Sequence, residues 1–546
     1  MKKIILNTFI ALLLIVQANA QNTWENYRSG VYPYLSRMAQ KGMVDFADLI
    51  QPVSRDKIKQ ALTKLNSQYS QLSNIEKSEL KFYLEEYPIL TDSSNNTNIQ
   101  LLKKDIYNRW RSVNLKSNEF ELHADPIIGM ESISGSGKSI KQVSNGFDIW
   151  GAAGKNKQWA YQVYYRDYTE TGTVNNNYKS INPEKGIILV GDKSESTINY
   201  SEVRANLSYA WKNGSLSIGK DNITWGYGEN SKIVLSDLAP SFPYIRFDYT
   251  PLKWMSFHYE NAWLNSNIID STRTYPTFTN DVMGDVRYAY IPKFLALHSI
   301  TIKPLKGLDI SIGESIVYSD KLDIGFLMPI NLFKIYDNNR SNYLINAGSN
   351  GQYFLQLNSR NQLKNSHLYA SLFIDEIKVS AIFDKVKRRN QLGFTLGGSV
   401  TDVFIHYLTM GAEYTRVNPF VYSNLIPAQF YTQYDYNLGD WMGNNFDRVS
   451  IFAKYTPLPK LRMYLKFEKI RKGGASTIYQ QYLVQPQQPF LFNYQFSRQN
   501  LFGQIIYEYI HNLYLNASVL IIQNKYNNGA NLKESTFKVG VSFGLN

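Results

Sequence analysis

The chain has 546 residues, a formal net charge of +13 at pH 7 and no cysteine. Without thiols it has no disulfide bond, no thiolate metal site and no cysteine nucleophile. Aromatic side chains make up 14% of the residues, and 41 of them are tyrosines, whose rings suit membrane–water interfaces. The basic excess favours anionic partners such as an acidic polysaccharide or the phosphates of lipopolysaccharide; the alternative is a scatter of solvated lysines with no specific partner.

Residues 1–20 have the three parts of a secretory signal peptide. Lys2 and Lys3 precede an apolar stretch at 4–16, and residues 18–20 (Ala-Asn-Ala) form a small-residue cleavage site. No later segment contains about 18 uninterrupted apolar residues, so the sequence predicts no membrane-spanning helix. We therefore predict an exported chain.

Residues 21–104 are predicted to form a small helical domain followed by a polar linker. Ser54 is a good helix N-cap, and apolar residues follow it at the i, i+3, i+4, i+7 spacing that begins at Ile58. Ser73 and Glu76 have the spacing of a capping box. The apolar stripes of these helices are typical of packing faces.

From residue 105 to residue 546 the apolar residues recur with a period of two. Near the C-terminus, Phe537, Val539, Val541 and Phe543 alternate with small or charged residues. Side chains of a strand alternate between faces, so this pattern gives one apolar wall and one polar wall. The length of the region predicts an all-β transmembrane barrel of about 18 antiparallel strands.

The turns of this barrel are predicted to be short on one side and long on the other. Three short proline-containing turns, such as the one at Pro457, are typical of the periplasmic side, and Arg462 to Glu468 alternate in a way that suits a polar lumen. An even strand number places the helical domain on the periplasmic side as well. Long polar stretches are predicted as outer loops at 131–146, 169–197, 265–285, 336–350 and 472–498.

Two segments, 217–246 and 413–446, depart from the plain strand pattern. Both combine glycines, aromatic rings, basic residues and amides, which is the chemistry that binds sugars: a ring stacks on C–H groups while amides and charges bond the hydroxyls. The alternative is that the glycines bend strands and the other side chains pack the barrel. The candidate polysaccharide-binding residues are Trp225, Tyr227, Arg246, Tyr414, Arg416, Trp441 and Asn445.

Catalytic and metal motifs are weak in this sequence. Residues 132–139 resemble a phosphate-binding loop but lack its first glycine, the six histidines lack metal-ligand spacing, and no serine stands in a nucleophile elbow. The acidic pair Glu85-Glu86 is predicted to lie on a solvated helix face. We predict a protein that is not an enzyme and has no cofactor; a barrel phospholipase is the alternative from the enzyme class.

The two unusual segments, in their order along the chain, resemble the Wzi-type capsule-assembly family of Gram-negative outer membranes. The resemblance rests on residues 219–228, 235–237, 413–419 and 431–445, together with the N-terminal region from Tyr32. It implies an 18-stranded barrel with a periplasmic helical bundle and a lectin-like role in holding capsular polysaccharide. The chain departs from the family pattern at Asp440, where a histidine is expected, and at its non-aromatic last residue.

The predicted function is therefore a non-enzymatic outer-membrane barrel that binds or organises capsular or extracellular polysaccharide. Its expected surroundings are outer-membrane lipid and lipopolysaccharide, with no nucleic acid, and the barrel is expected to be monomeric. The alternatives are an outer-membrane diffusion channel and a surface accessory of gliding or secretion machinery.

Overall fold

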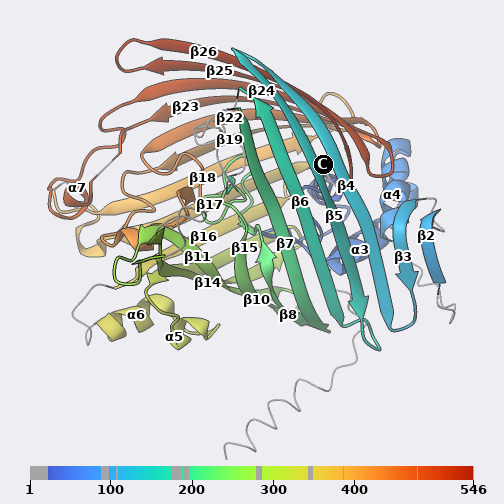
Figure 1. The fold of residues 1–546 in the computed structure, drawn as a ribbon, viewed down its shortest axis with the longest axis horizontal. Coiled ribbons are helices and arrows are strands. Elements are labelled where there is room, and N and C mark those ends of the chain that lie inside the picture. The colour runs from blue at the N-terminus through green and yellow to red at the C-terminus, as the bar shows by residue number, and fades with distance from the viewer. Residues whose placement is uncertain are drawn as a thin grey trace, which may run out of the picture.

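The computed structural model shows a closed β-barrel whose lumen and one rim carry additional segments (Figure 1). The predicted signal peptide lies outside the residues that it describes. These are 23–87, 98–105, 109–173, 186–188, 196–277, 286–341, 348–384, 386–475 and 477–544.

The barrel has 18 antiparallel strands and confirms the predicted fold class. It closes where β26 (Asn531–Phe543) pairs with β4 (Phe120–Gly135), from Phe537↔Ser134 to Phe543↔Ile128. The strands between them are β5 (Lys138–Ala153), β6 (Trp159–Gly172), β7 (Thr197–Trp211), β8 (Gly214–Asp221), β10 (Phe242–Leu252), β11 (Met255–Ile269), β14 (Tyr290–Leu305), β15 (Leu308–Ser319), β16 (Asn350–Arg360), β17 (Ser366–Ile377), β18 (Asn390–Thr401), β19 (Leu408–Val417), β22 (Phe446–Leu458), β23 (Leu461–Lys472), β24 (Phe496–Ile510) and β25 (Leu513–Tyr526).

A further hairpin extends the sheet next to the seam. Its strands are β2 (Asn98–Lys104) and β3 (Trp110–Lys116), and β3 pairs with the first part of β4, from Val113↔Ala124 to Lys116↔Glu121. β3 and β26 thus share one edge of β4. The sheet of the barrel thus begins with β2 at Asn98, whereas the sequence predicted that its first strand starts at about residue 105.

The alternation of side chains produces the expected two walls. On β26, Phe537, Val539 and Val541 are exposed on the outside, and Val539 retains 62% of its accessible surface. Lys538 points to the lumen, where it lines a cavity. An apolar outer wall around a polar lumen is the arrangement of a barrel that sits in a membrane. Among the described residues, no helix combines the length and apolar character needed to cross a bilayer.

The two rims of the barrel differ in the length of their connections. At one rim, the turns between β7 and β8, β10 and β11, and β14 and β15 have two residues each. We call this rim the short-turn end and the opposite rim the long-loop end. The long-loop end carries the connections 173–196, 222–241, 270–289, 320–349, 378–389, 418–445 and 473–495.

The predicted outer loop at 131–146 is wrong. β4 and β5 run through this stretch and are joined by a tight turn at Ser136-Gly137, both with positive φ. The physical reason is that Ile133 and Ile140 pair across the hairpin and are buried with Ile198. This apolar contact holds a segment together that otherwise has the composition of a polar loop.

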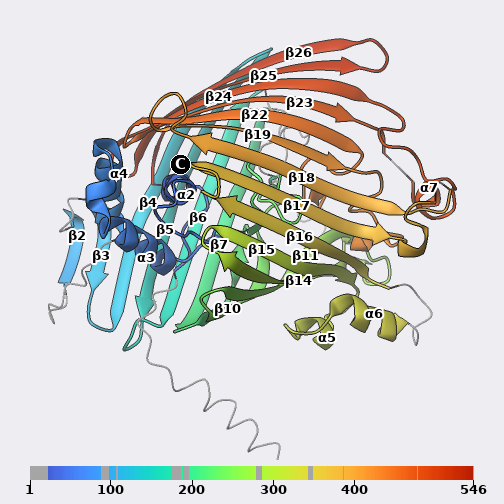
Figure 2. The same ribbon diagram turned by 180° about the vertical axis from the view of Figure 1, so that it is seen from behind.

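Three helices precede the barrel and form their own apolar core: α2 (Val31–Gln40), α3 (Arg55–Asn66) and α4 (Asn74–Glu86). The Ser54 cap and the Ser73–Glu76 capping box are both present, as predicted. We call these helices the helical unit. It lies against the short-turn end, where the Tyr407 hydroxyl donates to Ser73 Oγ at 2.8 Å (Figure 2).

Two connections from the long-loop end fold back into the lumen, and we call residues 222–241 and 418–445 the plug. The short strand β9 (Thr224–Trp225) of the plug pairs with β1 (Ile50–Gln51), which precedes α3. Segments that enter from opposite rims therefore meet inside the barrel. Plug and inward wall residues share the largest apolar core of the described chain.

The remaining short elements lie in the connections. They are β12 (Tyr275–Pro276), β13 (Val286–Arg287), β20 (Thr432–Gln433), β21 (Tyr436–Asn437), α5 (Ile324–Leu327), α6 (Phe333–Ser341) and α7 (Ile478–Tyr482), with 3-10 turns at Tyr69–Gln71, Val379–Ala381 and Pro427–Gln429.

Candidate functional site: the plugged lumen

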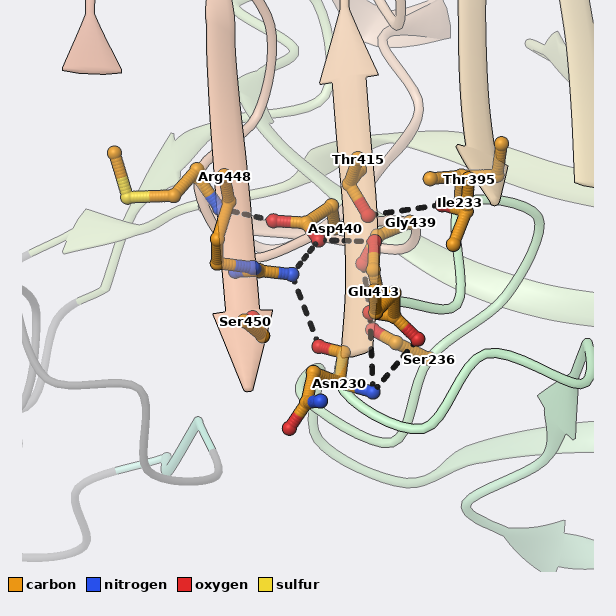
Figure 3. Close-up of polar contacts among 12 residues, drawn as sticks. Asn230, Ile233, Ser236, Thr395, Glu413, Thr415, Gly439, Asp440, Arg448 and Ser450 are labelled. Atoms are coloured by element: carbon orange, nitrogen blue, oxygen red, sulfur yellow. Dashed lines mark hydrogen bonds and ion pairs between the residues drawn. The ribbon is translucent and has the colours of Figure 1, made fainter. Parts of the chain in front are cut away.

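A buried charge cluster joins the plug to the wall (Figure 3). Arg448, on β22, donates to Asp440 Oδ2 at 2.6 Å and to the carbonyl oxygen of Asn230 at 2.9 Å. Glu413, on β19, accepts the backbone N–H of Glu229 at 2.8 Å and that of Asn230 at 3.2 Å. One wall arginine and one wall glutamate thus hold both arms of the plug.

The Asp440–Arg448 pair is fully withdrawn from water, with side-chain exposures of 1% and 0%. A charge in such a place is stable only while its partner stays, because burial removes its hydration. Asp440 also accepts the hydroxyl of Ser231 and the backbone N–H of Met442. Asp440, where the resemblance to the Wzi-type family predicted a histidine, therefore binds both the wall and the neighbouring plug residues.

Hydrogen bonds from two tyrosine hydroxyls connect the two segments of the plug to each other. Tyr422 donates to the carbonyl of Ile233 at 2.7 Å, and Tyr431 donates to that of Val234 at 2.8 Å. The two tyrosine rings stack with centroids 5.5 Å apart. Both arms of the plug are therefore bonded to each other as well as to the wall.

Three of the seven predicted polysaccharide-binding residues are buried inside the barrel, two in the plug core and one against the N-terminal segment. Trp225 is 1% exposed and its ring meets Phe354 edge-on at 6.0 Å. Tyr227 is also buried in the plug core. The guanidinium of Arg246 bonds Asp248 at 2.8 Å, donates to the carbonyl of Pro52 at 3.1 Å, and covers the ring of Trp24 at 4.1 Å.

The other four lie nearer the long-loop end. Tyr414 and Arg416 are on the outer side of β19; the Tyr414 hydroxyl donates to Asp447 at 3.2 Å, and the Arg416 guanidinium lies 3.8 Å from the centre of the Phe490 ring. Trp441 is half-buried beside the plug core. Asn445 is buried and bonds the loop 473–495 through the carbonyls of Gly474 and Phe492. The structure does not bring the seven residues together around one space.

At the short-turn end, the helical unit is bonded to the barrel around Glu86. This carboxylate pairs with Arg111 of β3 at 2.7 Å and with Arg55 at 2.8 Å, and His511 lies 3.4 Å away. Burial raises the pKa of Glu86, but Arg111, His511 and Arg55 outweigh it and hold the pKa well below its ordinary value. The solvated face predicted for this residue is wrong, because β3 and the turn after β24 cover it.

Within the helical unit, Arg37 of α2 and Glu79 of α4 form a buried ion pair. Burial nevertheless raises the pKa of Glu79 to about 7, since it outweighs the attraction of Arg37. The helical unit therefore contains a carboxyl group that changes its charge near neutral pH.

A cavity of about 670 Å³ remains in the lumen beside the plug, a volume within the range of small-molecule sites. It lies between β4–β8 on one side and β23–β26 on the other, and it is partly covered by residues 186–188 and Pro240-Ser241. Five basic and three acidic side chains line it, so its lining is net positive. They are Arg28, Arg166, Lys220, Lys466 and Lys538, with Glu131, Glu202 and Glu468.

The cavity also offers aromatic and amide groups. Tyr168 and Tyr200 stack with ring centroids 4.8 Å apart and an interplanar angle of 12°. Phe502 and the amides of Gln142, Asn500, Gln504 and Asn516 complete this part of the lining. Among the described residues, no group of three or more histidine, aspartate or glutamate side chains could hold a metal ion. Aromatic, amide and basic groups together suit a hydroxylated, negatively charged ligand.

The sequence identified this cavity only in part. Lys466 and Glu468 were expected to face the lumen and do line the cavity, whereas none of the seven predicted binding residues is among its described lining residues. The sequence feature that could have identified the cavity is the alternation of polar residues on β24, β25 and β26, whose lumenal side chains line it. Glu468 also lies 3.7 Å from Arg448, so the cavity borders the charge cluster that holds the plug.

These features define the class of the protein: a plugged, 18-stranded β-barrel of the outer-membrane type. Its fold matches that of Wzi of Escherichia coli, an outer-membrane protein involved in group 1 capsule assembly and described as a carbohydrate-binding β-barrel. The match has a TM-score of 0.58 and 12% identity, and covers 96% of this chain and 99% of Wzi.

Two other matches are weaker. OccK8 (OprE) of Pseudomonas aeruginosa has a TM-score of 0.42 at 12% identity and covers 77% of this chain and 97% of that one. OccAB4 of Acinetobacter baumannii has a TM-score of 0.43 at 8% identity and covers 78% and 97%. No family model and no curated protein sequence matches the chain. The comparisons show the fold.

Proposed function

We propose that the protein is a non-enzymatic outer-membrane barrel that binds and organises capsular or extracellular polysaccharide at the cell surface, as a monomer. The observation that carries this proposal is the lumenal cavity, whose basic, amide and aromatic lining fits an acidic glycan. The Wzi-like fold supports it, since Wzi is described as carbohydrate-binding.

In the proposed orientation the long-loop end faces outward and the helical unit lies in the periplasm, because turns of outer-membrane barrels are short on the periplasmic side. The chain has no cysteine, so single cysteines report topology cleanly. On intact cells, a cysteine at the exposed Ser136 or Ala475 should react with an impermeant maleimide, and one at Lys253 should not. The opposite pattern would reverse the orientation.

The mechanism is retention by many weak contacts. A polymer that offers the same unit many times converts weak single contacts into durable attachment. Tyr414, Arg416 and Trp441 are accessible enough to contact glycan at the rim. Trp225, Tyr227, Arg246 and Asn445, which are buried, act in this proposal by positioning the plug and its neighbouring loop.

The direct test measures binding of the purified barrel to acidic polysaccharide from its own cell surface and to a neutral glycan. In the variant Arg28→Gln/Lys220→Gln, affinity for the acidic glycan should fall about 10- to 100-fold, at about 0.7–1.4 kcal/mol for each of the two lost contacts. Lys253→Gln, at a turn of the short-turn end, is the matched control and should bind normally. Equal binding by all three proteins would refute the cavity as the site.

A diffusion channel is the second candidate, because the cavity provides an open space with a charged lining inside the lumen. The plug opposes this function, since its apolar core fills the lumen between β8 and β22. Purified protein in planar bilayers should show no steady conductance if polysaccharide binding is the function. Stable single-channel currents would favour the channel.

A further inference from the structure

The connection between β15 and β16 forms a short helical hairpin, α5 and α6, which lies outside the ring of strands, as both ribbon views show (Figures 1 and 2). Among the described parts of this rim, the connection after β11 carries the small β12–β13 pair, and the two plug segments fold into the lumen. This one instead packs on the outer wall, against β11, β14, β15 and β16. We call residues 320–341 the wall hairpin.

The register of the strands proves the side on which the wall hairpin lies. Leu297 faces the lumen, where it packs with the plug core, and it pairs with Glu260 and Ser315. The next residues, Tyr259, His298 and Glu314, pair with one another and point outward. The outer wall therefore carries a row of polar groups at a place where a membrane barrel normally has apolar ones.

The wall hairpin bonds all three of these groups. Glu314 Oε1 accepts the backbone N–H of Phe333 at 2.5 Å, at the start of α6. His298 Nδ1 donates to the carbonyl of Pro329 at 2.8 Å. The Tyr259 hydroxyl donates to the carbonyl of Phe326 at 2.9 Å. Polar groups that would be costly in hydrocarbon thus have partners within the protein.

Aromatic packing seals the same contact. Phe326 and Phe333 are fully buried against the wall, and the Phe326 ring lies 4.6 Å from the ring of Tyr318. Together with Phe294, Ile316 and the wall residues above, they form a separate apolar core on the outside of the barrel. The hairpin is therefore a fixed part of the outer wall.

The opposite face of the wall hairpin is apolar and unpaired. Ile330 is 87% exposed and Ile324 is 76% exposed, and Met328, Leu332 and Ile335 are exposed beside them. This face continues into the bare outer wall below it, where Ile300 and Ile312 are also exposed. The continuity argues for the same neighbour on both surfaces, because the bare wall of a barrel contacts lipid.

We propose that the wall hairpin is a lipid-contacting element that rests in the outer leaflet of the membrane. Its apolar face meets the acyl chains, and Lys321 and Lys334 at its edges are placed to meet lipid phosphates. Of its three acids, Asp323 pairs with Arg340, Asp337 is buried and accepts the backbone N–H of Ser349, and Asp320 accepts the hydroxyl of Ser319. The occupant is lipid rather than a second protein, since the exposed face is an extension of the lipid-facing wall. This inference is independent of polysaccharide binding.

The test uses single cysteines in the cysteine-free chain, labelled with an environment-sensitive fluorophore and reconstituted in phosphatidylethanolamine–phosphatidylglycerol vesicles. The probe is placed at Ile330, at Ile312 as the bare-wall reference, and at Asn338 as the exposed polar control on α6. Brominated acyl chains should quench Ile330 as strongly as Ile312 and should leave Asn338 unchanged. A soluble quencher should act in the reverse order.

A result in which Ile330 behaves like Asn338 would overturn the proposal. Protection of Ile330 from both quenchers would overturn it too, because a protein neighbour would then cover the face. A second variant, Ile324→Asp, places a charge on the apolar face. Its barrel should remain folded, as judged by heat-modifiable migration in electrophoresis. It should nevertheless reduce acyl-chain quenching of a probe at Ile335.

Discussion

Replacing Asp440 by asparagine tests whether the buried charge cluster holds the plug. The change keeps the size of the side chain and removes its charge, so Arg448 loses the acid that it contacts at 2.6 Å. Glu468, at 3.7 Å, remains. The arginine side chain has no exposure to water and would be left largely uncompensated.

The expected cost is about 3–5 kcal/mol, the usual penalty for removing one partner of a buried ion pair. Because the plug is the element that can move, this cost should favour its local release while the barrel stays closed. Each 1.4 kcal/mol is a tenfold change in an equilibrium constant, so the open population should rise about 10²- to 4 × 10³-fold.

The assay is the rate at which a maleimide labels a cysteine at Val234, a buried plug residue, in the wild-type and Asp440→Asn backgrounds. Asp270→Asn is the control, since its partner Arg273 is 52% exposed and a solvent-exposed ion pair contributes little to stability. The double variant Asp440→Leu/Arg448→Met removes both charges and should label more slowly than Asp440→Leu alone. Wild-type labelling rates in Asp440→Asn would show that the ion pair does not hold the plug.

Three further predictions concern the helical unit, the plug and the cavity. Because burial raises the folded pKa of Glu79 to about 7, above its ordinary 4.5, the contribution of this carboxyl group to the stability of the helical unit should be full below about pH 4.5 and be lost as the pH rises through 7. Glu86, whose pKa is lowered, loses its own contribution at acidic pH, so the measured quantity is the difference between the wild type and Glu79→Gln in amide exchange corrected for intrinsic rates, which should change between about pH 4.5 and 7. In the plug, a Cβ at Gly228 would lie 1.8 Å from the carbonyl oxygen of Ser231, so Gly228→Ala should accelerate labelling at Val234, whereas Gly393→Ala, with its nearest neighbour at 3.5 Å, should not. In the cavity, Tyr168→Ala removes one ring of a stacked pair and should weaken binding of acidic glycan about two- to tenfold, from about 0.5–1.5 kcal/mol; unchanged binding would exclude this pair from the site.

Local rules predicted much of the fold. Strand alternation and region length gave the number of barrel strands, and the caps at Ser54 and Ser73 fixed two helix starts. These features depend on neighbours within a few residues. The hairpin at Ile133 and Ile140 was missed because its stabilising contact with Ile198 is distant in sequence.

The plug, the cavity and the wall hairpin depend on contacts across the barrel, and local patterns do not contain them. Glycine, aromatic and amide residues serve internal packing in the plug as well as they would serve a sugar site, and composition does not separate the two. One feature of the sequence does correspond to the wall hairpin: residues 294–297 of β14 (Phe-Leu-Ala-Leu) are all apolar and do not alternate with polar residues. Such a run indicates a strand that is covered on both faces.

The ladder between β1 and β9 connects the two rims of the barrel through its interior. Ile50 reaches Trp225 from the short-turn end, while Trp225 belongs to a connection of the opposite rim. A displacement of the helical unit would therefore break this ladder and remove one contact of the plug, although the hydrogen bonds between β4 and β26 that close the cylinder stay in place.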